Sequence, residues 1–308
     1  MDKQTGSPSR DLVAGLMSVA IAVVLSGCGV ASDPGSAGQS QSAGTSATGS
    51  STTPATAPTA ALATKTLTGV PVYWVAESRR SFALYREFRD VPDTGGPISS
   101  AVSAMTSLKP LDPDYLTPWR PASRVTVTQK GEAITVDLSR DAFANTQVGS
   151  EVADRAVQQL VYTATAAAQQ AGTPASSVKI TVGGIAFDAW GVIRLGEAMG
   201  RAPLSAVQAQ TWITSPQEGE NLAAGTVTFK GFGTSFEANF VWEVRNDSGA
   251  VVAKGLTTGG GANGTFAELT FTARLTAGKY SVKVSGTDGS GGAEGPGVAT
   301  DDKAFTVI

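Results

Sequence analysis

Histidine is absent from the 308 residues of this sequence, and Cys28 is its one cysteine. Without histidine the chain lacks the commonest general base and metal ligand, and every Ser-His or Cys-His nucleophile pair is excluded. A single cysteine also excludes an internal disulfide bond and a thiolate metal cluster. Much of enzyme chemistry is therefore removed before any motif is considered.

Two short motifs match known signatures but stand in unsuitable local structure. Gly259, Gly261 and Gly264 have the spacing of a dinucleotide-binding loop, which needs a helix after it. The following segment alternates like a strand, which predicts a hairpin loop instead. Ser176 and Lys179 match the S-x-x-K pair of penicillin-recognising enzymes, which opens a helix. Here the pair enters a predicted strand, where residues three apart lie on opposite faces.

Acidic residues are the remaining candidates for metal binding. Asp112, Asp114, Asp137 and Asp141 could together hold a hard cation, and the segment 288–302 carries carboxylates in a glycine-rich loop. Neither group follows the Asp-x-Asp-x-Asp-Gly spacing of a calcium loop. We therefore expect solvated carboxylates, with no metal and no cofactor.

One loop combines the residue types that dominate binding hot spots. Tyr115, Trp119 and Arg120 lie in or beside the segment TPWRPAS, between prolines, and could form a binding anchor. The alternative is a loop folded over the helix layer, with Trp119 at the edge of the core. The sequence leaves both interpretations open.

Cys28 stands at the end of an apolar run and the start of a polar one. The uncharged stretch Leu12–Leu25 follows two basic residues and is shorter than the ~20 residues that a membrane-spanning helix needs. It is typical of a signal-peptide core. Leu25-Ser26-Gly27-Cys28 resembles a bacterial lipobox, which implies removal of residues 1–27 and attachment of acyl chains such as palmitate to Cys28. The alternative is a free or buried cysteine in an ordinary signal sequence.

Between Cys28 and the first predicted strand the chain is almost entirely Ser, Thr, Ala, Gly, Pro and Gln. Such a segment buries too little apolar surface to offset the entropy of ordering. We therefore predict a disordered linker over residues 28–66, which tethers the folded part to the extracytoplasmic face of the cell membrane.

The first folded domain is predicted over residues 67–192. Apolar alternation predicts two strands within 69–91, and helical spacing predicts helices over 97–108 and 150–171. A hairpin is expected around Lys130-Gly131, and the segment SVKITVGG returns as a strand. This order predicts an α+β domain of two layers, with helices packed on a mixed sheet.

These segments resemble a GerMN domain, known from sporulation and spore-germination proteins. The resemblance rests on VPVYWV, GGPISSAVSAMTSL, SRVTVTQKGEAITVDLS and the long helix containing LVYTAT. Its most specific parts are Val136–Ser139 and Leu160–Thr165. The resemblance implies a module that packs against partner proteins in the envelope, similar to ring-building modules. It implies no catalytic residues.

The second domain is predicted over residues 208–308, where seven short β-rich runs separated by turn residues indicate an antiparallel sandwich. Asn246–Gly249 is expected to form a hairpin turn, and Trp242 to be the central core aromatic. The segment LTAGKY resembles a tyrosine corner around Tyr280. From about Thr211 onward the chain resembles the immunoglobulin-like domain of bacterial spore germination, which implies binding of other envelope components.

The sequence therefore predicts a non-enzymatic, lipid-anchored adaptor of the cell envelope, which binds envelope proteins or peptidoglycan and leaves the oligomeric state open. A net charge of −3 without a basic block disfavours nucleic acid as a partner. One alternative is an enzyme acting on peptidoglycan or another wall polymer through two carboxylates ~5–9.5 Å apart. Another is a solute-binding lipoprotein, which needs a deep cleft between two α/β lobes.

Overall fold

The computed structural model describes residues 65–79, 81–289 and 297–308. Cys28, the predicted signal segment 1–27 and nearly all of the predicted linker 28–66 lie outside the described residues. Within the described ranges, none of the helices combines the length and the apolar character needed to cross a membrane.

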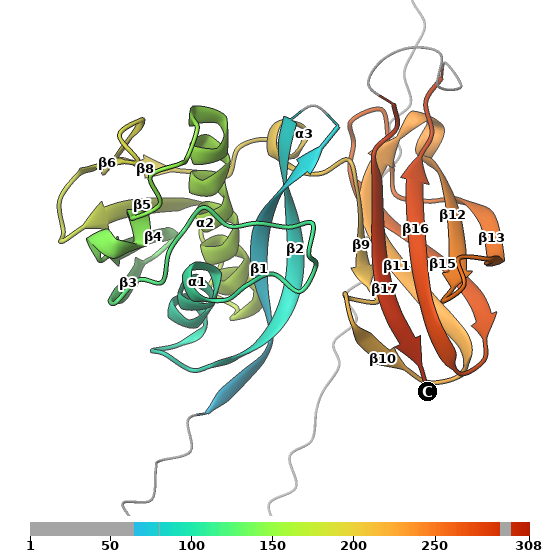
Figure 1. Ribbon diagram of the computed structural model, residues 1–308. Coiled ribbons are helices and arrows are strands. Elements are labelled where there is room, and N and C mark those ends of the chain that lie inside the picture. Colours follow the sequence, from blue (N-terminus) through green and yellow to red (C-terminus); the bar gives the residue numbers. More distant parts are fainter. Residues whose placement is uncertain (1–64, 80, 290–296) are drawn as a thin grey trace, which may run out of the picture. The chain divides into compact units, whose positions relative to one another are not determined.

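A long β-hairpin begins the described chain (Figure 1). β1 (Thr66–Ser78) pairs with β2 (Ser81–Pro92) in antiparallel register, and the run Val70–Ala76 is buried without interruption. Such a run is typical of a strand that is covered on both faces. Because successive side chains point to opposite faces, Trp74 lies on one face of the hairpin and Tyr73 on the other.

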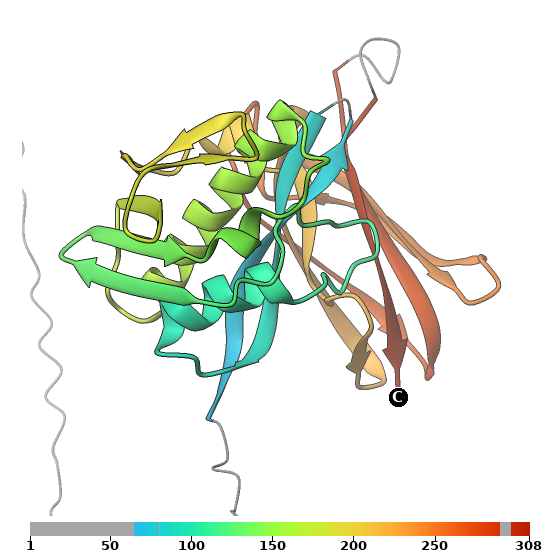
Figure 2. The ribbon, with the colours of Figure 1, turned by 60° about the vertical axis from the view of Figure 1, so that its left-hand side comes forward.

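Two helices pack between this hairpin and a second sheet (Figure 2). α1 (Pro97–Ser107) begins with a proline, whose missing N–H breaks no helical hydrogen bond in the first turn. α2 (Ser150–Gln170) is followed by Gly172 in the left-handed region, with φ of 76°. Both helices contact β1 on one side and strands of the second sheet on the other.

The second sheet is mixed and has the order β3-β4-β5-β8. β3 and β4 form the predicted hairpin around Gly131, and β4 runs parallel to β5 through the crossover that α2 provides. Its strands are β3 (Val125–Lys130), β4 (Ala133–Leu138), β5 (Ser177–Val182) and β8 (Ala198–Met199). The shorter elements of this half are η1 (Arg140–Phe143), β6 (Phe187–Ala189), β7 (Ile193–Leu195) and α3 (Leu204–Val207).

The helices pack on a mixed sheet, as predicted, but the prediction of two layers is wrong. The hairpin forms a separate third layer instead of joining that sheet. α2 is accordingly buried well beyond its predicted apolar stripe, and Gln159 and Thr163 make hydrogen bonds to the backbone of Tyr73. A stripe of alanine and valine predicts the face toward one sheet only. Gln159 and Thr163, which face the hairpin, are polar, so a pattern of apolar residues does not predict that they are buried.

The carboxyl-terminal half is a largely antiparallel β-sandwich that contains all seven predicted strands. One sheet has the order β10 (Glu220–Leu222), β17 (Thr300–Val307), β16 (Gly278–Gly286), β12 (Asn239–Asn246), β13 (Val251–Thr258). The other contains β14 (Gly261–Ala262), β11 (Gly225–Ser235) and β15 (Ala267–Leu275), with β9 (Thr211–Ser215) also paired to β11. η2 (Phe236–Ala238) precedes β12.

Phe229 and Phe240, rather than Trp242, are the fully buried aromatic residues of the sandwich core. Phe240 is fully buried, whereas Trp242 is half-buried and stacks on Phe271 with ring centroids 4.6 Å apart. Both side chains lie on one face of β12, but Trp242 lies opposite Gly255 of the edge strand β13. A Cβ atom at Gly255 would lie 2.6 Å from the indole ring, so the glycine leaves room for it. The prediction of Trp242 as the central aromatic is therefore wrong.

The segment LTAGKY forms the predicted tyrosine corner. The hydroxyl of Tyr280 donates a hydrogen bond of 3.0 Å to the backbone carbonyl of Thr276. The Asn246–Gly249 turn is also confirmed, with the Gly249 N–H bonded to the Asn246 carbonyl at 2.8 Å. Both turns could be predicted from the sequence because the residues that form them are neighbours along the chain.

Replacing Tyr280 by phenylalanine removes this corner hydrogen bond and the 3.5 Å contact between the hydroxyl groups of Tyr280 and Thr276. We expect Tyr280→Phe to lower the free energy of unfolding by about 0.5–1.5 kcal/mol, as measured by urea denaturation. Thr276→Val is the matched control, because it removes only the contact between the two hydroxyl groups and keeps the accepting backbone carbonyl. Equal stability of Tyr280→Phe and the unsubstituted chain would show that the corner contributes nothing.

Candidate functional site

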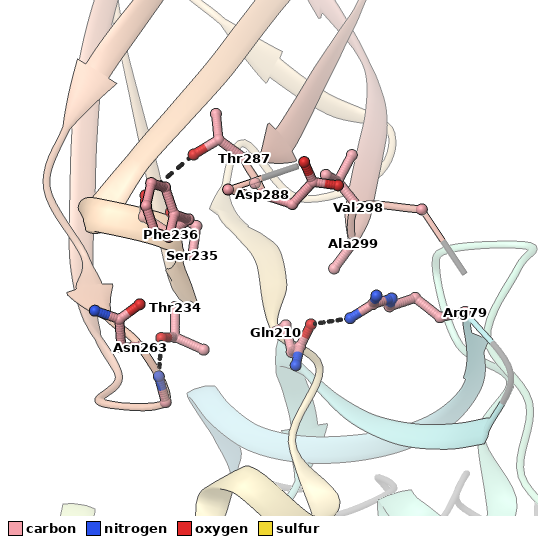
Figure 3. Close-up of a pocket in the computed structure, with 14 residues that line it drawn as sticks. Arg79, Gln210, Thr234, Ser235, Phe236, Asn263, Thr287, Asp288, Val298 and Ala299 are labelled. Carbon is pink, nitrogen blue, oxygen red and sulfur yellow. Dashed lines mark hydrogen bonds between the residues drawn. The ribbon is translucent and has the colours of Figure 1, made fainter. Parts of the chain in front are cut away.

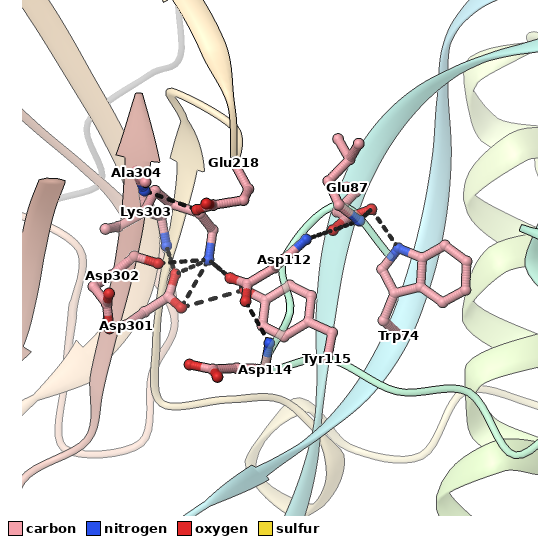
Figure 4. Close-up of polar contacts among 12 residues, drawn as sticks. Trp74, Glu87, Asp112, Asp114, Tyr115, Glu218, Asp301, Asp302, Lys303 and Ala304 are labelled. Carbon is pink, nitrogen blue, oxygen red and sulfur yellow. Dashed lines mark hydrogen bonds and ion pairs between the residues drawn. The ribbon is translucent and has the colours of Figure 1, made fainter. Parts of the chain in front are cut away.

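Lys303 is buried beside two carboxylates and a phenol (Figure 4). Its Nζ lies 2.5 Å from Oδ2 of Asp112, 2.9 Å from Oδ1 of Asp301 and 2.7 Å from the hydroxyl oxygen of Tyr115. The exposed fraction of the Lys303 side chain is 3%. We call Lys303, Asp112, Asp301 and Tyr115 the Lys303 cluster. It joins residues 191 positions apart in sequence.

Strand β17 supplies two members of the cluster. Asp301, Lys303, Phe305 and Val307 alternate along it and are all buried. Phe305 and Val307 belong to the core of the sandwich, whereas Lys303 contacts the loop that follows α1. The cluster is not predicted from the sequence, although one signal indicates it. Charged residues at the core-facing positions of a strand call for buried partners.

A further buried carboxylate, Glu87, holds the loop that carries Asp112. Its Oε1 accepts hydrogen bonds from the backbone N–H groups of Leu111 and Asp112, at 2.8 and 3.0 Å. Its Oε2 accepts one from the indole of Trp74 at 2.8 Å. The hairpin therefore orients Asp112 through Glu87, and the carboxyl group of Asp112 faces Lys303 (Figure 4).

Burial and charge shift the acid–base properties of the cluster. Burial raises the pKa of Asp301 to about 6, although Lys303 and the Ile213 N–H bond, at 2.6 Å, act in the opposite direction. Burial also acts against the charged amine of Lys303, but the two neighbouring carboxylates outweigh it and raise the pKa of Lys303. The pKa of Tyr115 is raised well above its ordinary value, mainly by burial, so its hydroxyl stays protonated.

Other contacts between the two halves accompany the cluster. The side-chain amide of Gln217 bonds both the N–H and the carbonyl of Phe88, at 2.5 and 3.0 Å. Trp212 of β9 packs into the core that is otherwise built by the first half. The Lys303 cluster therefore lies within an interface that also has apolar and backbone contacts.

A crevice of about 250 Å³ lies near the tip of the hairpin (Figure 3). Arg79 and Gln210 line one side and bond each other at 2.9 Å. On the other side, the hydroxyl of Thr234 accepts from the Gly264 N–H at 2.9 Å, and the hydroxyl of Thr287 donates to the Phe236 carbonyl. The hydrogen-bonding groups named here are used within the chain, so the crevice is a weaker candidate than the cluster.

The three residues predicted as a binding anchor do not lie together on the surface. Tyr115 belongs to the buried cluster, and Trp119 is 1% exposed and packs against Phe143 and Trp190. The position of Trp119 is the one that the core interpretation predicts. Arg120 is exposed, and its N–H bonds the carbonyl of Ala142.

Trp119 lies beneath a surface hollow that the sequence analysis missed. The hollow has a volume of about 510 Å³ and is lined in part by Arg140, Phe143, Phe187 and Trp190. The guanidinium of Arg140 lies 5.0 Å from the ring centroid of Phe187. We call this surface the aromatic hollow. Its residues come from η1 and from β6 with the turn that follows it, two segments that are far apart in sequence and share no common pattern.

The expectation of solvated carboxylates is wrong for Asp112 and Asp301, which are buried together in the Lys303 cluster. Asp137 and Asp141 are engaged separately from that cluster. Asp137 pairs with Arg124 and accepts from the Gly184 N–H, and these bonds lower the pKa of its carboxyl although burial opposes them. Hydrogen bonds from Ser139 and Ser123 lower the pKa of Asp141. Across the described ranges, no three potential ligands among His, Cys, Asp and Glu lie close enough to hold a metal ion.

The two short motifs adopt the local structures that the sequence predicts. Gly259, Gly261 and Gly264 lie between β13 and β15, so a strand and not a helix follows them. Ser176 directly precedes β5, which contains Lys179. Neither motif has the helix that its chemistry requires.

Comparison with known proteins assigns both halves. Residues 71–187 match the family model Germane, described as sporulation and spore germination. Residues 210–293 match the model described as the immunoglobulin-like domain of bacterial spore germination. The chain contains both domains. Neither description names an enzymatic activity.

None of the curated proteins compared with the chain matches it. Among solved structures, CopC from Methylosinus trichosporium OB3b is 22% identical, with 32% of this chain and 92% of that chain covered and a TM-score of 0.24. The fibronectin(III)-like modules of CbhA from Clostridium thermocellum are 14% identical, with 32% of this chain and 94% of that chain covered and a TM-score of 0.21.

The raised pKa of Asp301 predicts a pH-dependent contribution to stability. The folded chain holds a proton on Asp301 below about pH 6, whereas the unfolded chain takes it up only near the ordinary value of 3.8. The Asp301 contribution to the free energy of unfolding therefore increases as the pH falls through 6 and is lost as the pH rises, by up to about 3 kcal/mol.

Asp301→Asn removes this titration, so we expect the stability difference between the unsubstituted chain and this variant to change between pH 7.5 and pH 4.5. Urea denaturation at several pH values measures it. Asp114→Asn, which changes an exposed carboxyl in the same loop as Asp112, is the control. A pH-independent difference for Asp301→Asn would contradict the assignment.

Proposed function

We propose that this protein is a non-enzymatic adaptor of the cell envelope, anchored by lipid at Cys28, whose folded part binds an envelope protein. The observation that carries the proposal is the Lys303 cluster between the two matched domains. The charged groups of the cluster bind one another within the chain. The contact between Lys303 and Asp112 joins the two domains. Two domains held in this way present their surfaces to a partner as one unit, which suits recognition.

The aromatic hollow is the surface that we assign to the partner. Tryptophan and arginine dominate protein-binding hot spots, and here Trp190 and Arg140 border the same depression. Arg120 adds a second exposed guanidinium on the neighbouring segment, beside Ala142. Trp119 supports the hollow from below. The loop predicted as a binding anchor would therefore contribute through Arg120 directly and through Trp119 indirectly.

The enzymatic alternative receives less support. Asp112 and Asp301 are two carboxylates that converge on one point, but that point is the buried amine of Lys303. A wall polymer would have to displace an interface between domains to reach them.

Substitutions in the hollow test the binding role. We expect Trp190→Ala and Arg140→Glu to reduce the amount of partner captured by the full chain about tenfold or more, because a hot-spot side chain contributes about 2 kcal/mol or more. In-cell crosslinking, followed by quantitative mass spectrometry of the attached proteins, measures this. Lys254→Glu on β13 is the control for a charge change elsewhere. Unchanged capture by folded hollow variants would reject this surface, and capture of membrane neighbours alone would reject the adaptor role.

The anchor is tested separately at Cys28. We expect Cys28→Ser to abolish acylation, because serine lacks the thiol that carries the lipid, and to move the protein out of the membrane fraction. Cell fractionation with immunoblotting measures the distribution, and Ser36→Ala in the predicted linker is the control. Retention of Cys28→Ser in the membrane fraction would contradict lipid anchoring.

A further inference from the structure

We propose that the side chains of Lys303 and Asp112 condense to an intramolecular amide that joins the two domains covalently, with Asp301 as the acid–base group. The amine nitrogen lies 2.5 Å from Oδ2 of Asp112. Because this oxygen is bonded to Cγ, the nitrogen is adjacent to the carbon that it attacks. Groups held in such proximity react with effective concentrations of about 10⁵–10⁸ M in favourable cases.

The reaction balances within the cluster. The ammonium group of Lys303 gives a proton to the carboxylate of Asp112, which leaves a neutral amine and a carboxylic acid. The nitrogen lone pair then forms the bond to Cγ, and Asp301 transfers a proton from the nitrogen to the departing hydroxyl. The C–O bond breaks, and one water molecule leaves. One ammonium and one carboxylate thus become one amide and one water, without oxidant, reductant or cofactor.

The surroundings favour this condensation. The cluster is shielded from solvent, with Asp112 and Lys303 side chains 5% and 3% exposed, and a neutral amide replaces two buried charges. Asp301 has both oxygens close to the amine, at 2.9 and 3.1 Å, and its raised pKa suits a group that exchanges protons near neutral pH.

The two carboxylates have different roles because their contacts differ. Oδ1 of Asp112 is held by the Asp114 N–H at 2.9 Å, which leaves Oδ2 directed at the amine as the leaving oxygen. Asp301 receives hydrogen bonds from the Ile213 N–H and from the hydroxyl of Tyr115, at 2.6 and 3.3 Å. These donors hold Asp301 in place while it shuttles the proton. Tyr115 also covers the amine, with its ring centroid 4.6 Å from Nζ.

Mass spectrometry of the purified full chain tests the bond. Trypsin cleaves after arginine and lysine but not before proline, so Asp112 lies in the peptide 90–124, and cleavage after Lys303 requires a free amine. We expect peptide 90–124 joined to peptide 284–308, lighter than their sum by the mass of one water molecule. Release of the free peptide 304–308 together with unmodified 90–124 would overturn the proposal. Fragmentation that places the amide on Asp301 would overturn the assignment of Asp112.

Four variants separate the roles of the residues. Lys303→Arg keeps the positive charge but cannot condense, and we expect it to fold without the crosslink. Asp112→Asn should give the same joined peptides, because a carboxamide forms the identical amide with release of ammonia. Asp301→Asn should lose the crosslink, and Asp114→Asn should keep it. Full crosslinking in Asp301→Asn would overturn the acid–base role. Circular dichroism confirms that each variant is folded, so that a missing crosslink reports on chemistry.

Discussion

Burial of the charged amine of Lys303 is the constraint on which the arrangement of the two domains depends. A buried ion needs partners of opposite charge, because the interior cannot replace the solvation that water provides. Here one partner, Asp301, comes from the same strand, and the other, Asp112, comes from the loop after α1 of the other domain. Separation of the domains would break the pair between Lys303 and Asp112, whereas the pair between Lys303 and Asp301 lies within strand β17.

The β1–β2 hairpin connects the Asp112 loop to helix α2 of the first domain. Its Trp74 face holds Glu87, which in turn holds the Asp112 loop. Its Tyr73 face is bonded to Gln159 and Thr163 of α2. A hairpin with one solvent-exposed face would position only one of these neighbours. Burial on both faces makes it a middle layer between the helices and the loop that meets the second domain.

Chemistry and recognition are separated in this molecule. The groups with the most perturbed acid–base properties, Asp301, Lys303 and Tyr115, are buried within the interface. The half-buried Trp190 and the exposed guanidinium of Arg140 border a hollow of the first domain instead. The proposed amide and the proposed partner surface therefore depend on different residues, and either can fail without the other. Both agree with a tandem of two domains related to sporulation and germination proteins.

Most individual elements were determined by the sequence itself, because their causes are local. Helical spacing, with Pro97 at the start of α1 and Gly172 after α2, predicted the two helices, and apolar alternation predicted the strands of the sandwich. The segment LTAGKY predicted the tyrosine corner around Tyr280. The lack of histidine likewise limited the available chemistry without any coordinates. The lipobox at Cys28 remains a prediction from sequence.

Only the tertiary structure decided which elements face one another. It separated the hairpin from the mixed sheet, placed Trp119 in the core and left Trp242 half-buried. Above all, it brought Lys303 to Asp112 across 191 positions. A residue pattern along one strand reports which face is buried, but not what covers that face. Packing between elements decides which residue lies beside a buried charge. Such contacts between distant segments leave no repeating pattern in the sequence from which they could be predicted.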